Sequence, residues 1–230
     1  MIPLYDHNPR HRLPLLTLVF IAICVLVFMH QASLGGLGNH AFLLAYAFIP
    51  ARLFTGAEVD MADVLAAPAS PSFTLLSSMF MHGSWMHLGG NMLYLWTFGD
   101  NVENRLGLVR FGIFYVLCGL AAALTQGLID PTSQIPMVGA SGAISGVLGA
   151  YLVLFPKAPV AVLIPQMGVQ NMSAATVLGM WFVYQAMASF GSLGQTGGGV
   201  AFFAHVGGFV AGWALIRFFA PKPQRTGLWE

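Results

Sequence analysis

The longest uncharged stretch of the chain runs from residue 158 to residue 216 and reads APVAVLIPQMGVQNMSAATVLGMWFVYQAMASFGSLGQTGGGVAFFAHVGGFVAGWALI. It holds 59 residues without a single Asp, Glu, Lys or Arg. A helix that crosses a bilayer needs about 20 apolar residues, so this stretch is too long for one span and fits two spans joined by a turn. We therefore expect a helical membrane hairpin, with helices near 173–191 and 200–219.

The composition extends this expectation to the whole chain. Of 230 residues, 57% are hydrophobic and only 7% are charged, whereas soluble domains carry about 25% charged residues. This argues against a soluble globular domain. The net charge of +1 provides no basic face that could follow a phosphate backbone, which excludes nucleic-acid binding. Cys24 and Cys118 lie in apolar runs, so we expect small buried side chains and neither a disulfide nor a thiolate metal site.

Further uncharged stretches precede the hairpin, and charges mark their limits. A charged side chain at the bilayer centre costs at least ~2.5 to 3.5 kcal/mol, so spans are expected between the charged residues. We predict an all-α membrane protein, a bundle of six transmembrane helices near 13–31, 84–100, 106–128, 139–155, 173–191 and 200–219.

The distribution of basic residues predicts the orientation of the bundle. Six spans place both termini on one side, and that side should hold the Lys and Arg of the short loops. We therefore expect both termini in the cytoplasm, with 1–12 and 221–230 as tails and 13–220 as the membrane domain. The residues expected on this side are Arg10, Arg12, Arg105, Arg110, Lys157, Arg217, Lys222 and Arg225, and Arg52 is expected on the other.

Three connections are then external, at 34–83, 129–138 and 192–199. Within the first, residues 40–50 are apolar but too short to span, so we expect them in the membrane interface. The glycine-rich residues 191–199 are expected to form a mobile lid that admits water.

A few polar side chains occupy the membrane segments, where they are candidates for a functional site. With a rise of about 1.5 Å per residue, His87, Asn91, Ser141 and His205 all lie within roughly 3 to 11 Å of the external ends of the predicted second, fourth and sixth helices. His82 precedes the second helix. These side chains therefore share one shallow level.

Small residues indicate which of these helices meet, because helices in membranes approach closely where small residues face each other. Around Ser141 and around His205, small residues recur at helical spacing, so the two side chains are expected to face each other. The packing residues are Gly142 and Gly146 with Ser145 and Gly149 on the fourth helix, and Gly208 and Gly212 on the sixth.

Together these residues predict nucleophilic catalysis. A serine needs a base to become a nucleophile, and a histidine can take the hydroxyl proton and later return it to a leaving amine. We assign Ser141 as the nucleophile, His205 as the base, and His87 with Asn91 as donors to an oxyanion, beside the Ser141 N–H. Since we expect no carboxylate at this level, we predict a dyad rather than a triad.

Several alternatives remain open from the residues alone. Ser141 could bond its own backbone, and His205 could be a core residue. A metal site formed by three histidines, a small-solute transporter, and a catalytically silent protein that binds transmembrane segments are also conceivable. The chain has no His-Glu-x-x-His for zinc, and its membrane aspartates, Asp100 and Asp130, fall at helix ends, which disfavours an aspartyl protease.

Four motifs resemble those of the rhomboid intramembrane serine proteases. They are His82-Gly-Ser-Trp-Met-His87-Leu-Gly-Gly-Asn91, Glu103-Asn-Arg-Leu-Gly107, Gly139-Ala-Ser141-Gly142 and Ala204-His205-Val-Gly-Gly208-Phe-Val-Ala-Gly212.

The resemblance implies a six-helix fold with Ser141 as nucleophile, His205 as base and His87 with Asn91 at the oxyanion. It places His82 at the mouth of a water-filled cavity. It also implies cleavage of transmembrane segments of other proteins near the external membrane face, often after a small residue, with no cofactor and no metal. A bacterial inner (plasma) membrane is the expected location.

The sequence departs from the family pattern in two places. Phe73 and Thr74 stand where many members have Trp-Arg, and Ser145 stands where some members have an aromatic side chain that stacks on the histidine. We therefore expect hydrogen bonding or packing by another residue to orient His205.

Overall fold

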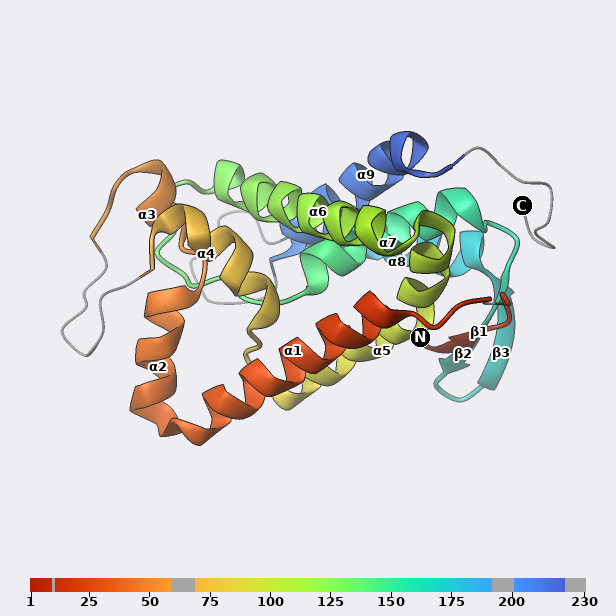
Figure 1. Ribbon diagram of the computed structural model, residues 1–230, viewed down its shortest axis with the longest axis horizontal. Coiled ribbons are helices and arrows are strands. Elements are labelled where there is room, and N and C mark those ends of the chain that lie inside the picture. The colour runs from red at the N-terminus through yellow and green to blue at the C-terminus, as the bar shows by residue number, and fades with distance from the viewer. Residues whose placement is uncertain (10, 59–68, 192–200, 222–230) are drawn as a thin grey trace.

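The computed structural model describes residues 1–9, 11–58, 69–191 and 201–221 (Figure 1). The chain is mostly helical, and each predicted helical segment overlaps one helix of the structure. These helices are α1 (Leu15–Ser33), α5 (Trp85–Leu106), α6 (Leu108–Ile129), α7 (Ser141–Leu154), α8 (Ala174–Gly191) and α9 (Phe202–Phe219).

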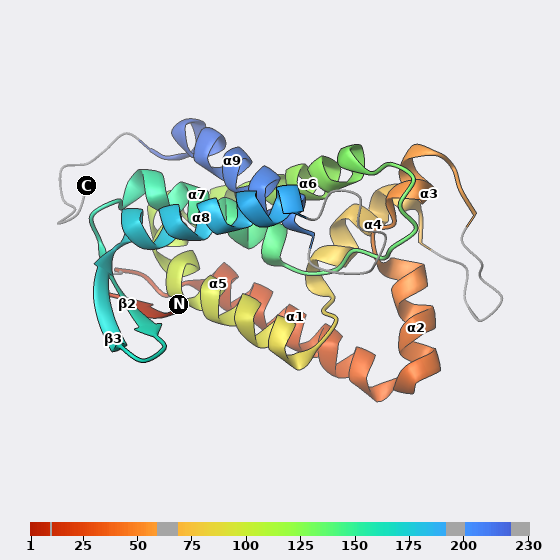
Figure 2. The ribbon, with the colours of Figure 1, turned by 180° about the vertical axis from the view of Figure 1, so that it is seen from behind.

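Among the described residues, three helices are long and apolar enough to cross a membrane by themselves, and these are α1, α6 and α9. Helix α7 has only 14 residues, but every residue from Gly142 to Tyr151 is buried. It packs against α5, α6, α8 and α9, and Figure 2 shows it in the middle of the bundle. The helix that begins at Ser141 is therefore the central element of the fold.

Helices α7 and α9 touch through their backbones. A Cβ atom added at Gly208 would overlap the carbonyl oxygen of Gly142, and one added at Gly212 would overlap that of Gly146. Gly149 likewise leaves room for the carbonyl of Phe209. Glycine allows this approach because its side chain is a single hydrogen atom, so the two backbones can come into contact. The register between the start of α7 and the start of α9 is thereby fixed.

A buried carboxylate joins α1 to α5. One oxygen of Glu103 accepts a hydrogen bond from the Leu16 N–H at 2.9 Å, and the other accepts from the N–H and the hydroxyl of Thr17, both at 2.8 Å. The first N–H groups of a helix lack partners within the helix. Glu103 supplies an acceptor to two of these N–H groups, and its buried carboxylate thereby accepts three hydrogen bonds.

Short helices occupy the segment between α1 and α5: α2 (Gly35–Tyr46), α3 (Pro50–Phe54) and α4 (Pro71–Ser77), followed by a 3₁₀ turn, η1 (Ser78–Phe80). Helix α2 lies across the end of α1 in Figure 1. Arg52 ties the segment together, because its guanidinium donates to the carbonyls of Leu44 at 3.2 Å and Ala69 at 2.9 Å. In α4, Phe73 is half exposed, whereas Thr74 is buried and donates its hydroxyl to the Pro71 carbonyl.

A three-stranded antiparallel sheet, in the order β1-β2-β3, covers the other end of the bundle. Its strands are β1 (Ile2–Asp6), β2 (Pro159–Ile164) and β3 (Gly168–Ser173), and Ile2 pairs with Leu163. The all-α prediction is wrong at this end, and residues 2–6 are part of a sheet rather than a tail. The uncharged run from residue 158 concealed β2, because Val160, Ala161 and Val162 are all buried and show no alternation.

Asp6 connects the sheet to the bundle. Its carboxylate accepts hydrogen bonds from the hydroxyl of Tyr151 on α7 and, at 2.9 Å, from the amide of Asn101 on α5. Burial raises the pKa of Asp6 to about 7, against the opposing effect of the Tyr151 hydrogen bond. The end of β1 is thus held by two helices of the core.

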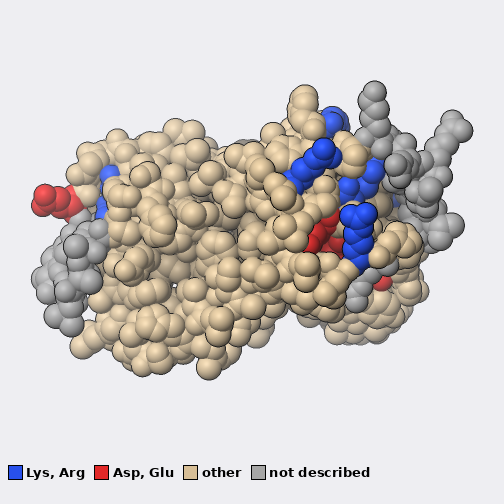
Figure 3. Space-filling view, in the orientation of Figure 1, with Lys and Arg blue, Asp and Glu red and all other residues tan. Residues whose placement is uncertain are grey.

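Charged side chains gather toward the two ends of the face seen in Figure 3, and the band between them is free of charge. Most of the visible Lys and Arg side chains lie at the end that carries the sheet. An uncharged band between charged ends is the arrangement that a bilayer imposes on a protein surface.

The contact between α7 and α9 predicts that Gly212→Ala destabilises the fold. The new methyl group would meet the Gly146 backbone, and inserting a methyl group into a packed contact typically costs about 1 to 3 kcal/mol. Thermal unfolding in detergent should show a lower Tm than the parent protein. The control is Gly179→Ala on α8, where no atom beyond the neighbouring backbone of its own helix lies within 4 Å of the added carbon and no loss is expected. Equal Tm values for both variants would contradict the close contact.

Candidate active site

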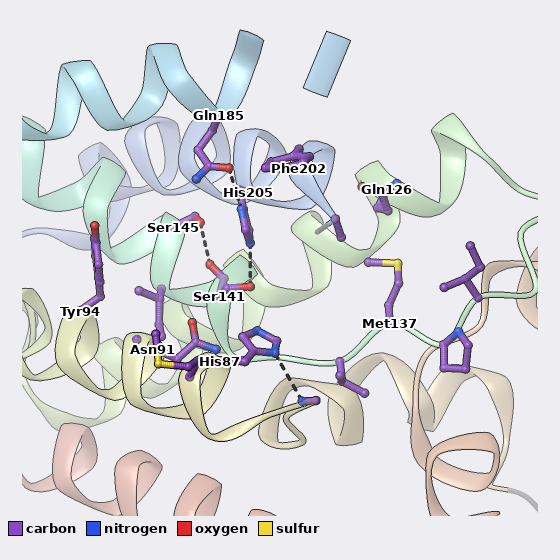
Figure 4. A pocket seen from close by; sticks show the side chains of 18 of the residues that line it. His87, Asn91, Tyr94, Gln126, Met137, Ser141, Ser145, Gln185, Phe202 and His205 are labelled. Atoms are coloured by element: carbon purple, nitrogen blue, oxygen red, sulfur yellow. Dashed lines mark hydrogen bonds between the residues drawn. The ribbon is translucent and has the colours of Figure 1, made fainter. Parts of the chain in front are cut away.

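A cavity of about 830 Å³ opens between α5, α7, α8 and α9 (Figure 4). Its wall brings together the four side chains of the predicted site, His87, Asn91, Ser141 and His205. They come from three helices and lie far apart in the sequence. Gln185, Trp181 and Gln126 contribute to the same wall.

Ser141 is the first residue of α7 and follows a tight turn at Gly139. Gly139 has φ +130°, and a side chain there would lie 2.8 Å from the His87 ring. Only glycine tolerates both this backbone angle and this approach. The Gly139 N–H donates to the Ser78 carbonyl at 2.9 Å, which holds the turn in place. The turn therefore presents Ser141 to the cavity with His87 alongside it.

The hydroxyl of Ser141 lies 2.8 Å from Nε2 of His205. Helix α7 begins at Ser141, so it offers this hydroxyl no carbonyl one turn back. Ser145 does make such a bond to the backbone, because its hydroxyl donates to the Ser141 carbonyl one turn back at 2.6 Å. The two serines thus have different roles: Ser145 bonds the backbone, and Ser141 faces the imidazole.

His205 lies in the first turn of α9 and makes a second contact through its other ring nitrogen. Nδ1 is 2.9 Å from Oε1 of Gln185 on α8. The rings of Trp181 and Phe202 lie 6.2 and 6.5 Å from the imidazole, between ring centres. Sequence reasoning did not identify Gln185, although it is the only amide side chain in α8, and an amide in an apolar helix is a signal for a polar partner.

His87 and Asn91 lie one turn apart on α5, below Ser141 in Figure 4. The N–H of Gly83 donates to Nδ1 of His87 at 3.4 Å, so a neutral His87 carries its proton on Nε2. Asn91 is 8% exposed, and its side-chain nitrogen has no hydrogen-bond partner among the described residues. The N–H groups at the start of α7 lack helix partners. The cavity therefore collects several hydrogen-bond donors next to the Ser141 hydroxyl.

His82 does not lie where the sequence analysis placed it. It is 1% exposed and lies behind His87, with ring centres 5.1 Å apart, and is absent from the described wall of the cavity. Its backbone exchanges two hydrogen bonds with the side chain of Gln31 on α1, both at 3.1 Å. Burial between α1 and His87 takes its ring away from the mouth of the cavity.

Two further expectations concern a lid and a metal. The predicted lid falls mostly on residues 192–199, which lie outside the described residues. In the described part of the chain, no group of three His, Cys, Asp or Glu side chains is arranged to hold a metal ion. Asp130 is the one carboxylate on the described cavity wall, and it accepts a hydrogen bond from the Thr132 hydroxyl at 3.1 Å.

This arrangement can perform acyl transfer. A hydroxyl in contact with an imidazole can be deprotonated as it attacks a carbonyl carbon. Donors clustered at one side of the hydroxyl can stabilise the negative charge that develops on the carbonyl oxygen. The geometry thus places a hydroxyl, an imidazole and several hydrogen-bond donors in one cavity.

Comparison with known proteins is consistent with this chemistry. The sequence model of the rhomboid family, described as "Rhomboid domain", matches residues 70–222. The chain is 31% identical over 150 residues to "RHOMBOID-like protein 5" of Arabidopsis thaliana, covering 65% of this chain and 45% of the relative. It is 31% identical over 163 residues to "Rhomboid protein 1, mitochondrial" of Saccharomyces cerevisiae, covering 66% and 44%.

A bacterial relative carries an enzyme name. The chain is 32% identical over 139 residues to "Rhomboid protease GluP" of Bacillus subtilis, covering 60% of this chain and 24% of the relative. In each of these three comparisons the match spans less than half the length of the relative.

The donor set predicts the effect of Asn91→Ala. Loss of one oxyanion donor among several lowers a rate by up to about 10²-fold. We expect such a decrease in the rate at which a fluorophosphonate labels Ser141, because attack on phosphorus passes through a pentacoordinate state that carries negative charge on the phosphoryl oxygen. Asn171→Ala, on exposed strand β3, is the matched control and should label at the parental rate. An unchanged rate in Asn91→Ala would remove Asn91 from the oxyanion pocket.

Proposed function

The chain belongs to the rhomboid family, and from this premise we propose that it is an intramembrane serine endopeptidase that cleaves transmembrane segments of other proteins. The observation that carries the proposal is the 2.8 Å contact between the Ser141 hydroxyl and Nε2 of His205 on the wall of a cavity within the bundle. Family membership alone would not distinguish a protease from a silent relative that binds transmembrane segments. The contact between nucleophile and base favours the protease.

The proposed reaction has two halves. In the first, Nε2 of His205 accepts the proton of Ser141 as the hydroxyl oxygen attacks the scissile carbonyl carbon, and the carbonyl oxygen becomes an oxyanion. His87, Asn91 and the first N–H groups of α7 stabilise that charge. When the carbon–nitrogen bond breaks, the imidazolium returns the proton to the leaving amine. In the second half, water takes the place of the hydroxyl and releases the carboxylate product.

The proposed substrate is an unwound stretch of a transmembrane segment with a small residue before the scissile bond. A second cavity, of about 40 Å³, lies beside Ser141. Its wall includes small side chains and glycines, among them Gly142, Ala143, Ala201 and Ala204. A space of this size holds a methyl group or a hydroxymethyl group and excludes large side chains. No cofactor takes part in the proposed reaction.

We further propose that the protein spans its membrane six times, with both termini in the cytoplasm. Helices α1, α6 and α9 meet the length and hydropathy of spans, and α5, α7 and α8 run with them in the bundle (Figure 2). The site then lies near the external face, and its helices α5, α7 and α9 begin there. The membrane in question is proposed to be a bacterial plasma membrane.

Covalent labelling tests the catalytic proposal without knowledge of the substrate. A fluorophosphonate should label Ser141 in the membrane-embedded protein, as mapped by mass spectrometry, and Ser141→Ala and His205→Ala should each abolish labelling while keeping the parental Tm. Cleavage of a model transmembrane substrate should disappear in the same two variants. A reactive serine hydrolase labelled in parallel is the positive control. If it is labelled and the parent protein is not, the protease proposal is rejected in favour of a catalytically silent protein that binds transmembrane segments.

Cysteine accessibility tests the proposed topology. Lys157→Cys should resist an impermeant maleimide applied to intact cells and react after lysis, because residue 157 is expected on the cytoplasmic side. Glu58→Cys, at an exposed position between α3 and α4, should react from outside. The native Cys24 and Cys118 are fully buried and serve as the unreactive background. Labelling of both positions from the same side would overturn the six-span topology.

A further inference from the structure

The two nitrogens of His205 have different neighbours. Nε2 faces the Ser141 hydroxyl at 2.8 Å, and Nδ1 faces Oε1 of Gln185 at 2.9 Å (Figure 4). A neutral imidazole carries one proton, so one nitrogen donates and the other accepts. The amide oxygen can only accept. Nδ1 must therefore carry the proton, which leaves Nε2 with the lone pair that receives the proton of Ser141.

Helix α8 supplies two contacts to the imidazole from one face. Trp181 and Gln185 are four residues apart and thus share a helix face. The Trp181 ring lies 6.2 Å from the His205 ring at an interplanar angle of 37°, and the Gln185 side chain is 8% exposed. The imidazole is consequently held by an amide at one edge and an indole on one side, both from a helix that does not carry the nucleophile.

The other residues that could orient the ring are engaged elsewhere. Ser145 uses its hydroxyl on the Ser141 carbonyl. Asp130, the carboxylate on the described cavity wall, bonds Thr132. His87 lies across the cavity on α5, and its Nδ1 is occupied by the Gly83 N–H. Within the part of the chain that the structure describes, Gln185 is the hydrogen-bond partner of Nδ1.

We propose that Gln185 is a positioning residue, which holds His205 in the tautomer and orientation that accept the proton of Ser141. This inference rests on the proposed serine protease function. Gln185 occupies the place that a carboxylate takes in a catalytic triad, where the third residue fixes the tautomer of the histidine. Because the amide is neutral, it orients the ring without stabilising the imidazolium by charge.

Two substitutions at this position separate orientation from packing. Gln185→Met keeps the length of the side chain and removes the oxygen acceptor, so the rate of fluorophosphonate labelling at Ser141 should fall about 10- to 100-fold, part of what general base catalysis supplies. Gln185→Glu restores an acceptor and adds a negative charge. It should recover the rate, and the midpoint of the acidic limb of its pH–rate profile should move to higher pH, because a carboxylate stabilises the protonated ring.

Three results would overturn the assignment: a parental labelling rate in Gln185→Met, a Gln185→Glu variant as slow as Gln185→Met, or recovery by Gln185→Glu with an unshifted profile. Met187→Leu, at an exposed position on the same helix, is the control for changes in α8 and should label like the parent. The parent protein and His205→Ala are measured in parallel. Failure of the parent to label would reject the protease, whereas failure confined to the Gln185 variants would reject only the positioning role.

Discussion

The direct contact between the backbones of α7 and α9 sets the positions of the reacting groups. Water does not drive helices together inside a bilayer, so association depends on close packing and on hydrogen bonds. Gly208 and Gly212 bring the α9 backbone against the carbonyls of Gly142 and Gly146, and Gly149 brings the α7 backbone against the carbonyl of Phe209. Ser141 begins one of these helices and His205 lies in the first turn of the other. The contact between them is thus a property of the helix packing and requires no adjustment of long, flexible side chains.

Most polar groups inside the bundle are paired, and many of the pairs join two elements. Glu103 connects α5 to the start of α1, Gln31 connects α1 to His82, and Asp6 connects β1 to α5 and α7. Such pairing is required where no water is present to solvate backbone and side-chain groups. The side-chain nitrogen of Asn91 has no hydrogen-bond partner among the described residues, as is also true of both ring nitrogens of His82 and the Tyr115 hydroxyl, but of these three residues only Asn91 lies on the described cavity wall. A buried donor without a partner is costly in a resting fold and useful where negative charge develops.

The sequence predicted those parts of the structure where the helical spacing of small residues and the position of polar side chains point to the same helix face. Charge-free stretches predicted the six long helices of the bundle, and the spacing of small residues from His205 and Ser141 indicated the face on which α7 and α9 meet. The strands were missed because β2 is buried on both faces and reads as part of a longer apolar run. Gln185 was missed because it lies on α8 and His205 lies on α9, so no spacing along one helix relates the two residues. The position of His82 depends on Gln31, a partner 51 residues away, and long-range contacts of this kind leave no local pattern.

The pairing of β1 with β2 has a consequence for how the chain is assembled during synthesis. Ile2 pairs with Leu163, so the first strand leaves the ribosome long before its partner exists. Helices α1 to α7 are made in the interval, and contacts between distant parts of a chain form slowly because a long loop must close. The sheet is therefore completed on a bundle that already contains Ser141. Until then the edge of β2 in the β2–β3 hairpin is unpaired, and a strand of another chain can pair with it. Asp6 reaches its hydrogen-bond partners Tyr151 and Asn101 only when β1 pairs with β2.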